Sequence, residues 1–308
     1  MNARSAAATA CAAACLAACV QTSSVRPPAA QVLTSIAPPD LPAVQPVVVD
    51  PRIIDEEVQA RRRTLAETAA YRWRIENLST SALAAAGAMR VTGRVSEGVS
   101  SADMDVIVFD SRQCALRVID QPHAYAGGGE IATSMREINA VGGVNGGYFT
   151  PEFRPLGLMV SHGKPTGSLV TSTLLGGLIV STGGSPRLLW RSEYSHAAAT
   201  TDLVQAGPRL VDESRPLPKL DRSKSRPRTF IATDGGHGWA VGVVKSTSLG
   251  ELAEMLATPG VLPGLRVQRA LNLDGGRSSA IWMRTAAGEE ISEPGWSTVR
   301  NFIAIVPR

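Results

Sequence analysis

The spacing of apolar side chains divides the chain into a helical segment and a long β-rich remainder. Ile54, Val58, Leu65 and Ala69 recur at helical spacing. An aspartate and a proline precede them, and acidic residues come before basic ones, which suits the N-cap and the dipole of a helix. The pattern predicts a helix over about 52–69 whose charged residues face solvent.

After Tyr71, short apolar runs alternate with turns that contain glycine or proline, which is typical of strands. The predicted strands are 71–76, 90–95, 104–110, 115–119, 143–149, 156–161, 174–180, 187–190, 203–206, 229–233, 239–244, 268–273, 280–284 and 301–306. Capping-box spacing predicts two short helices, one from Ser134 to Ala140 and one over 249–257. The expected fold class is α+β: a single mixed domain of many short strands, with a few helices packed on the sheet.

The beginning of the chain has the pattern of a secretory leader: a short positive start and then an alanine-rich apolar stretch. The stretch ends in Leu16-Ala17-Ala18-Cys19, which resembles the lipobox of bacterial lipoproteins. This resemblance implies cleavage before Cys19, a lipid on its thiol, and a location in the bacterial cell envelope, lipid-anchored on the periplasmic or outer-membrane side. The alternative is an ordinary signal peptide that is cut nearby without lipidation.

Four parts are therefore expected along the chain, because residues 20–51 are rich in proline and alanine and read as an extended tether. The parts are a lipoprotein signal peptide at 1–18, a tether at 19–51, a helix at 52–70 and the mixed domain at 71–308.

Charge and cysteine content exclude several classes of protein. The chain has 31 basic and 27 acidic residues and no long basic run with interleaved aromatics, so no nucleic-acid partner is predicted. Cys11, Cys15 and Cys19 belong to the leader, which leaves Cys114 as a packed strand thiol and excludes a disulfide framework. The four histidines have no metal-ligand spacing, and neither a Walker A motif nor a serine-hydrolase elbow occurs.

Polar side chains are concentrated in residues 270–281. Asp274-Gly275 between two apolar runs predicts a hairpin turn. A turn alone does not require the amide, guanidinium and hydroxyl groups that surround it, in Asn272, Arg277, Ser278 and Ser279. Glycines such as Gly275 and Gly276 allow a ligand to approach the backbone, whose N–H groups can bind an anion. By contrast, Asp234-Gly235-Gly236 has plain flanks and predicts only a hairpin.

Two other segments offer complementary chemistry. Asn145-Gly146 is a hairpin dipeptide, yet an aromatic pair follows at once, so a plain turn and a sugar-binding loop are equally favoured. Arg226 and Arg228 point to the same side of a predicted strand, and arginine is suited to bidentate recognition of phosphate. The alternative for this pair is a basic surface loop.

Six motifs in order resemble the phosphodiester glycosidase family over about residues 90–308. They are Asn145–Phe149, Pro155–Leu158, Gly207–Val211, Arg226–Thr229, Asn272–Gly276 with Ser278 and Ser279, and Val299–Ile303. The resemblance implies a mixed α+β fold and cleavage of a sugar–phosphate glycosidic bond. One departure is Arg277, which stands where the family's usual motif has a third glycine.

The resemblance implies roles for the candidate residues. Asp274, Arg228 and Asn145 are the candidate catalytic residues, with Glu152 as a spare carboxylate. Asp274 is expected to attack, to activate water, to hold a divalent ion or to orient the loop, and these four roles stay open. The candidate substrate-binding residues are Gly146, Gly147, Tyr148, Phe149, Arg226, Asn272, Gly275, Gly276, Arg277, Ser278 and Ser279. Glycine N–H groups are expected to share the phosphate charge, asparagines to bond sugar hydroxyls and an aromatic side chain to stack on the ring.

The expected function is that of an envelope-anchored hydrolase of glycosyl-1-phosphodiester bonds. Its expected partners are a phosphate-linked glycan or nucleotide-sugar-like substrate and, through the N-terminal lipid, a membrane. No cofactor is assigned, although a divalent cation is a candidate. The alternatives are a non-catalytic polysaccharide-binding lipoprotein of exopolysaccharide metabolism and a metal-dependent phosphodiesterase that cuts the P–O bond.

Overall fold

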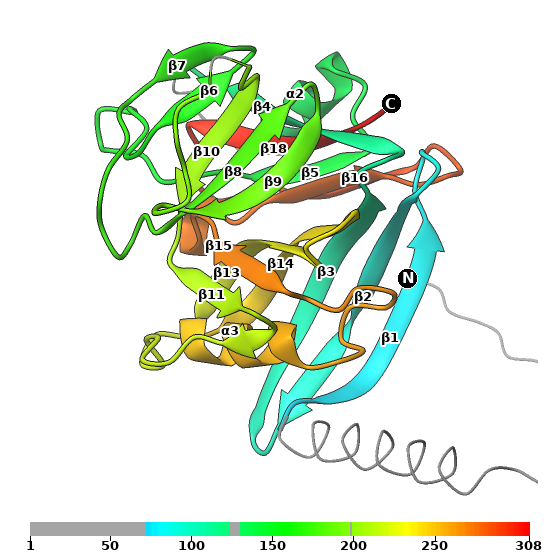
Figure 1. The fold of residues 1–308 in the computed structure, drawn as a ribbon. Coiled ribbons are helices and arrows are strands. Elements are labelled where there is room, and N and C mark those ends of the chain that lie inside the picture. The colour runs from blue at the N-terminus through cyan, green and yellow to red at the C-terminus, as the bar shows by residue number, and fades with distance from the viewer. Residues whose placement is uncertain (1–71, 124–129, 198) are drawn as a thin grey trace, which may run out of the picture. The chain divides into compact units, whose positions relative to one another are not determined.

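The computed structural model describes residues 72–123, 130–197 and 199–308 (Figure 1). The predicted leader, tether and N-terminal helix lie outside these residues. Strands dominate the described part of the chain, which contains two α-helices and one short 3₁₀ helix. The predicted α+β class is thus confirmed only coarsely, because most of the regular structure is sheet. No helix in the described ranges is long and apolar enough to cross a membrane.

The largest sheet has eight antiparallel strands in the order β1-β2-β3-β14-β13-β15-β11-β12. These strands are β1 (Arg74–Ala82), β2 (Ala88–Glu97), β3 (Ser100–Asp110), β11 (Arg209–Asp212), β12 (Arg215–Pro216), β13 (Arg226–Thr233), β14 (Gly238–Thr247) and β15 (Arg269–Asn272). The central strands β13 and β14 are buried along most of their length, because other elements cover both faces of the sheet.

Two five-stranded sheets complete the fold, and each is named after its central strand. The β5 sheet has the order β17-β16-β5-β18-β4, with β17 (Glu290–Glu293), β16 (Ile281–Arg284), β5 (Gly142–Asn145), β18 (Asn301–Pro307) and β4 (Cys114–Asp120). The β10 sheet has the order β7-β6-β10-β8-β9, with β7 (Lys164–Thr166), β6 (Met159–Ser161), β10 (Asp202–Ala206), β8 (Gly177–Thr182) and β9 (Ser185–Trp190).

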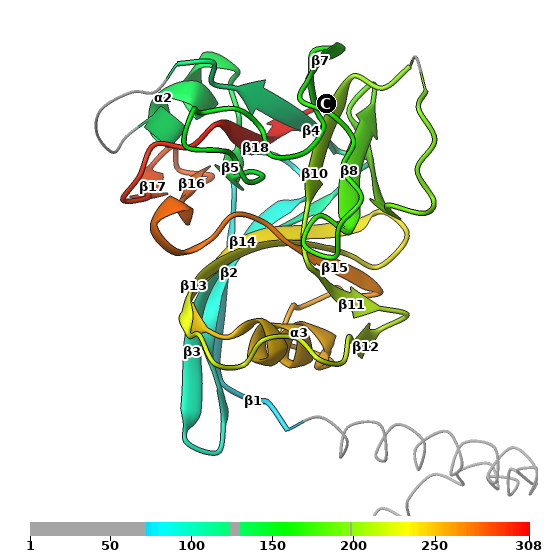
Figure 2. The same ribbon diagram turned by 90° about the vertical axis from the view of Figure 1, so that its left-hand side faces the viewer.

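All three sheets meet in one apolar core. Ile107 of the eight-stranded sheet, Val144 of the β5 sheet and Ile179 of the β10 sheet belong to the same buried cluster. Figures 1 and 2 show the eight-stranded sheet lying between this core and helix α3 (Leu249–Ala257). Leu252 and Leu256 of α3 are packed in the second cluster, on the opposite face of the sheet. The large sheet is therefore the layer that holds the other elements in place.

The helix predictions were half right. Helix α3 begins as predicted, since Ser248 and Glu251 form a complete capping box. Helix α2 spans Glu130–Glu137, so the predicted start at Ser134 is wrong. Ser134 lies inside the helix, where its hydroxyl accepts a 2.8 Å hydrogen bond from the Gln121 side chain, and this tertiary partner replaces the expected cap. Both helices are short, and each is stabilised by packing on a sheet.

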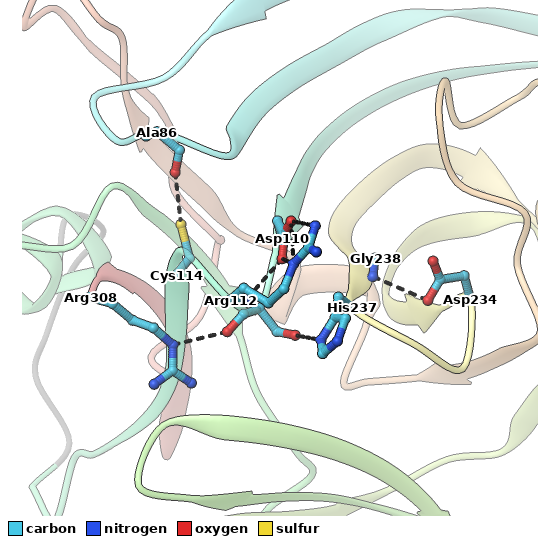
Figure 3. A network of polar contacts seen from close by, with 9 residues as sticks. Ala86, Asp110, Arg112, Cys114, Asp234, His237, Gly238 and Arg308 are labelled. Carbon is cyan, nitrogen blue, oxygen red and sulfur yellow. Dashed lines mark hydrogen bonds and ion pairs between the residues drawn. The ribbon is translucent and has the colours of Figure 1, made fainter.

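Of the two predicted Asp-Gly hairpins, one is confirmed and one is wrong. The hairpin at Asp234 is confirmed, because Thr233 of β13 pairs with Trp239 of β14. Figure 3 shows the Asp234 carboxylate accepting the Gly238 N–H across this turn, at 3.1 Å. The hairpin at Asp274 is wrong, because β15 and β16 belong to different sheets. The chain instead crosses between the two sheets through the 3₁₀ helix η1 (Gly276–Ser278).

Four strands were missed, namely β7, β11, β12 and β17. They have two to four residues and include proline or charged side chains, so they show no apolar alternation. Cys114, in contrast, is fully buried at the start of β4, as predicted, and burial raises the pKa of its thiol.

Candidate active site

Three segments that are far apart in sequence meet where the eight-stranded sheet adjoins the β5 sheet. The backbone N–H of Asp274 donates to the Gly146 carbonyl at 3.0 Å. The Asn145 side chain donates through Nδ2 to the Asp274 carbonyl at 2.7 Å. These two hydrogen bonds connect the loop after β15 to the end of β5. They hold Asp274 beside Asn145 and Gly146.

Asn145 is fully buried and connects three elements. Its Oδ1 accepts bonds from the Thr229 hydroxyl of β13, at 2.7 Å, and from the Ala280 N–H, at 3.0 Å. Ser279 joins the same group, with its Oγ 3.1 Å from the Thr229 Oγ1. Because its amide is already committed to protein partners, Asn145 acts as a positioning residue in this arrangement. Thr229 was not among the predicted site residues, although it lies inside one of the six motifs.

The backbone N–H groups of Gly146 and Gly147 both donate hydrogen bonds to Asn301. The Gly146 N–H donates to the Asn301 backbone carbonyl at 2.9 Å, and the Gly147 N–H donates to the Asn301 Oδ1 at 2.8 Å. These two N–H groups are therefore not available to a phosphate, contrary to expectation. A Cβ on Gly146 would lie 1.8 Å from the Asn301 Oδ1, so only glycine fits there. Asn301 is a further residue that site prediction missed, although the motif Val299–Ile303 contains it.

The Asp274 carboxyl group is half-buried. Burial raises its pKa, and this effect is opposed by hydrogen bonds from the Ser278 side chain and from the Gly275 N–H, which donates to Oδ1 at 2.8 Å. No cation in the described part of the chain forms an ion pair with Asp274. A carboxylate with a raised pKa and no neutralising partner is a common property of catalytic acids and bases.

Arg228 is the complementary charge. Its side chain is buried, donating to the Thr247 carbonyl at 3.3 Å and to the Lys224 carbonyl at 2.9 Å. Burial and the nearby Arg226 lower its pKa, Tyr148 and the charge of Asp221 act in the opposite direction, and no carboxylate within the described ranges forms an ion pair with it. A buried guanidinium without a counter-ion is costly unless an anion binds to it.

The glycine loop lies directly against this arginine. A Cβ on Gly275 would lie 3.1 Å from the Pro227 carbonyl and 3.8 Å from the Cδ of Arg228, and a Cβ on Gly276 would lie 3.8 Å from the Cδ of Arg226. The absence of side chains at the two glycines therefore brings the loop backbone close to both arginines. The Gly275 N–H already donates to Asp274, so it does not contribute to an anion nest here.

Tyr148 and Asn272 are hydrogen-bonded to each other near these charges. Asn272 Nδ2 donates to the Tyr148 hydroxyl at 2.7 Å, and that hydroxyl donates to the Gly207 carbonyl at 2.7 Å. Burial and the charge of Asp274 raise the tyrosine pKa, while Arg228 lowers it, which shows that all three groups lie within electrostatic range. The Oδ1 of Asn272 is buried without a hydrogen-bond partner in the described structure.

The remaining predicted residues lie at the rim or outside. Ser278 is buried, with its Oγ 3.4 Å from that of Ser297. Arg277 is exposed, and its carbonyl accepts hydrogen bonds from the N–H groups of Trp296 and Ser297. Phe149 packs edge-on against Phe153 at 5.3 Å and is partly buried beside α2, so it is not a free stacking surface.

Glu152 does not join this group. It is exposed on the turn after Phe149, and the nearby Thr150 hydroxyl lowers the pKa of its carboxyl group. A metal role is likewise not assigned, because no group of three or more potential ligands (His, Cys, Asp or Glu) occurs in the described ranges. Asp274 and Arg228 therefore remain the two charged candidates for the site's chemistry.

This geometry places the Asp274 carboxylate and the Arg228 guanidinium within electrostatic range of the same tyrosine, Tyr148, beside the glycine loop. A family model described as phosphodiester glycosidase matches residues 138–306, which include every one of these groups. The chain belongs to the phosphodiester glycosidase family. No curated protein matches it by sequence.

Three solved structures share the fold. The zebrafish N-acetylglucosamine-1-phosphodiester α-N-acetylglucosaminidase catalytic domain, auto-inhibited by its pro-peptide, is 14% identical, with a TM-score of 0.52 over 75% of this chain and 88% of that chain. A hypothetical protein from Synechocystis is 16% identical, with a TM-score of 0.50 over 72% of this chain and 62% of its own length. An exported protein from Burkholderia pseudomallei is 14% identical, with a TM-score of 0.51 over 69% of this chain and 75% of that one. At these identities the likeness shows the fold alone.

Gly146→Ala should destabilise the protein, because the added methyl group would collide with Asn301. We expect a loss of about 1–3 kcal/mol in the free energy of unfolding, measured by urea denaturation. Gly176→Ala is the matched control, since its Cβ would make only ordinary contacts of 3.5 Å. Equal stability of the two variants would contradict the close approach of Asn301.

Asp274→Asn should change the pH dependence of stability. Because the folded pKa is raised, the wild-type protein loses stability as the pH rises from the ordinary aspartate range through the folded pKa. Asparagine keeps the acceptor for Gly275 and does not titrate. The variant should therefore gain stability relative to wild type as the pH rises from about 4 through the folded pKa, as measured by urea midpoints. A difference that stays constant or shrinks over this range would disprove the raised pKa.

Proposed function

We propose that the protein hydrolyses the bond between the anomeric carbon and the phosphate of a glycosyl-1-phosphodiester and releases the free sugar. The single observation that carries this proposal is that two charged groups lie within electrostatic range of Tyr148: Asp274, half-buried with a raised pKa, and Arg228, buried without an ion pair to any described residue. Membership of the phosphodiester glycosidase family supports the same reaction class.

Arg228 and Asp274 would have different roles in the reaction. When the C1–O bond breaks, its electron pair goes to a phosphate oxygen, and Arg228 would stabilise the resulting charge. A phosphate monoester leaves readily, so the general acid used by most glycosidases is not needed. Asp274 would take the proton from the attacking water, and its raised pKa makes it the stronger base for that step.

The surrounding residues would position this pair. The bonds of Asn145 and Asn301 hold the loop backbone, and Tyr148 keeps its proton because its pKa is raised. The unpartnered Oδ1 of Asn272 offers an acceptor that would take a hydrogen bond from a sugar hydroxyl after a small movement. Exposed Arg277 would extend the positive charge at the rim.

We also propose that the mature chain is tethered to the envelope by a lipid on Cys19. The support is the alanine-rich leader that ends in Leu16-Ala17-Ala18-Cys19. Metabolic labelling with a radioactive fatty acid should mark the wild-type protein and not Cys19→Ser. Equal labelling of both, or labelling of neither, would exclude the anchor at this cysteine.

Asp274→Asn and Arg228→Gln should each lower the rate of sugar release by about 100- to 1000-fold, because each removes a charge that acts on the transition state. The assay is release of free sugar from a panel of glycosyl-1-phosphodiesters. The matched controls are Asp234→Asn, in the other Asp-Gly-Gly turn, and Arg187→Gln, exposed on β9, and both should keep wild-type rates.

Each other outcome has a distinct meaning. Release of sugar 1-phosphate in place of free sugar would indicate P–O cleavage. Binding of polysaccharide without turnover of any substrate would support the non-catalytic alternative. The anomeric configuration of the first product, followed by NMR, decides whether Asp274 activates water, giving inversion, or attacks the sugar, giving retention.

A further inference from the structure

A cavity of about 790 Å³ lies next to the candidate active site, on the other side of Gly207-Pro208. Pro208 and Arg209 line the cavity. The preceding carbonyl, of Gly207, accepts the bonds from Tyr148 and Asn272 at 2.7 and 3.0 Å. One short segment between β10 and β11 thus forms both a wall of the cavity and the backing of the site.

The cavity carries an excess of positive charge. Its lining residues include Arg191, Arg209 and Lys219 and no aspartate or glutamate. Arg209 is partly compensated by Asp212 at 3.8 Å and by the charge of nearby Glu193, but both carboxylates also pair with Arg269, at 3.5 and 2.7 Å. Arg191 and Lys219 form no ion pair with any described residue. An anion would therefore find a favourable potential in this cavity.

The cavity walls also contain hydroxyl groups that can donate hydrogen bonds to the oxygen atoms of an anion. Hydroxyl side chains line one part of the cavity, those of Thr171, Ser172, Thr173 and Ser192. The guanidinium of Arg209 lies 5.0 Å from the ring centroid of Trp190, and that of Arg269 lies 4.9 Å from it. These stacking contacts hold Arg209 in place before any ligand binds, which lowers the entropic cost of binding.

We propose that this cavity binds a second anionic group of the substrate, so that the preferred leaving group carries a further phosphate beyond the scissile phosphodiester. Arg191, Arg209 and Lys219 would pair with that phosphate, and the hydroxyl side chains would donate hydrogen bonds to its oxygens. The role of this anion site in the reaction rests on the function proposed for the adjoining site. The anion site itself follows from the cavity alone.

The first test is direct binding of inorganic pyrophosphate to the full chain, measured by calorimetry. The double variant Arg191→Gln/Lys219→Gln should bind pyrophosphate at least about tenfold more weakly, because each side chain supplies a charge-assisted hydrogen bond. The matched control is Arg187→Gln/Lys164→Gln, which removes two cations on β9 and β7 that do not line the cavity. No pyrophosphate binding by wild type, or equal binding by all three proteins, would overturn the proposal.

The second test compares a glycosyl-1-diphosphate ester with a methyl phosphodiester of the same sugar. The double variant should raise KM for the diphosphate substrate about tenfold, leave kcat unchanged, and leave both constants unchanged for the methyl substrate. Equal effects on the two substrates would overturn the inference. If wild type released no sugar from either, while pyrophosphate binding still depended on Arg191 and Lys219, the proposed function would fail and the anion site would stand.

Discussion

The amide of Asn145 is the contact on which the arrangement of the site depends. Its carbonyl oxygen accepts bonds from Thr229 and Ala280, and its nitrogen donates to Asp274, so one buried side chain joins β5, β13 and the crossing loop. A buried amide that lost any of these partners would leave an unpaired polar group at a cost of about 1–3 kcal/mol. The network therefore stabilises one relative position of the two sheets, and Asp274 has its place because of it.

The charges in the site have the opposite effect on stability. Arg228 is buried and Asp274 is half-buried, and neither forms an ion pair with a described residue. Such groups cost folding free energy that the apolar core must offset. An anionic ligand at Arg228 would remove part of this cost, so ligand binding and stability should be linked. The cavity beside Pro208 also has more cationic than acidic side chains. Arg191 and Lys219 form no ion pair with a described residue, and Arg209 shares Asp212 with Arg269.

Local patterns predicted local structure well. Alternating apolar residues located the long strands, and the Ser248–Glu251 spacing located α3, because both signals depend on neighbours in sequence. The same reasoning failed at Ser134 and at Asp274-Gly275, where a distant partner decides the outcome. The two Asp-Gly-Gly segments show the limit most clearly. Asp234 closes a hairpin, whereas Asp274 lies in a crossing between sheets.

The sequence alone determined the β-rich character of the domain, the family, and the short list that contains Asn145, Arg228 and Asp274, because these follow from residue type and order. Only the tertiary structure decided what each residue does. It assigned the N–H groups of Gly146 and Gly147 to Asn301, left Arg228 without a counter-ion, and placed a cationic cavity behind Gly207. The physical reason is that hydrogen bonding, burial and charge compensation depend on which distant strands meet, and no local pattern contains that information.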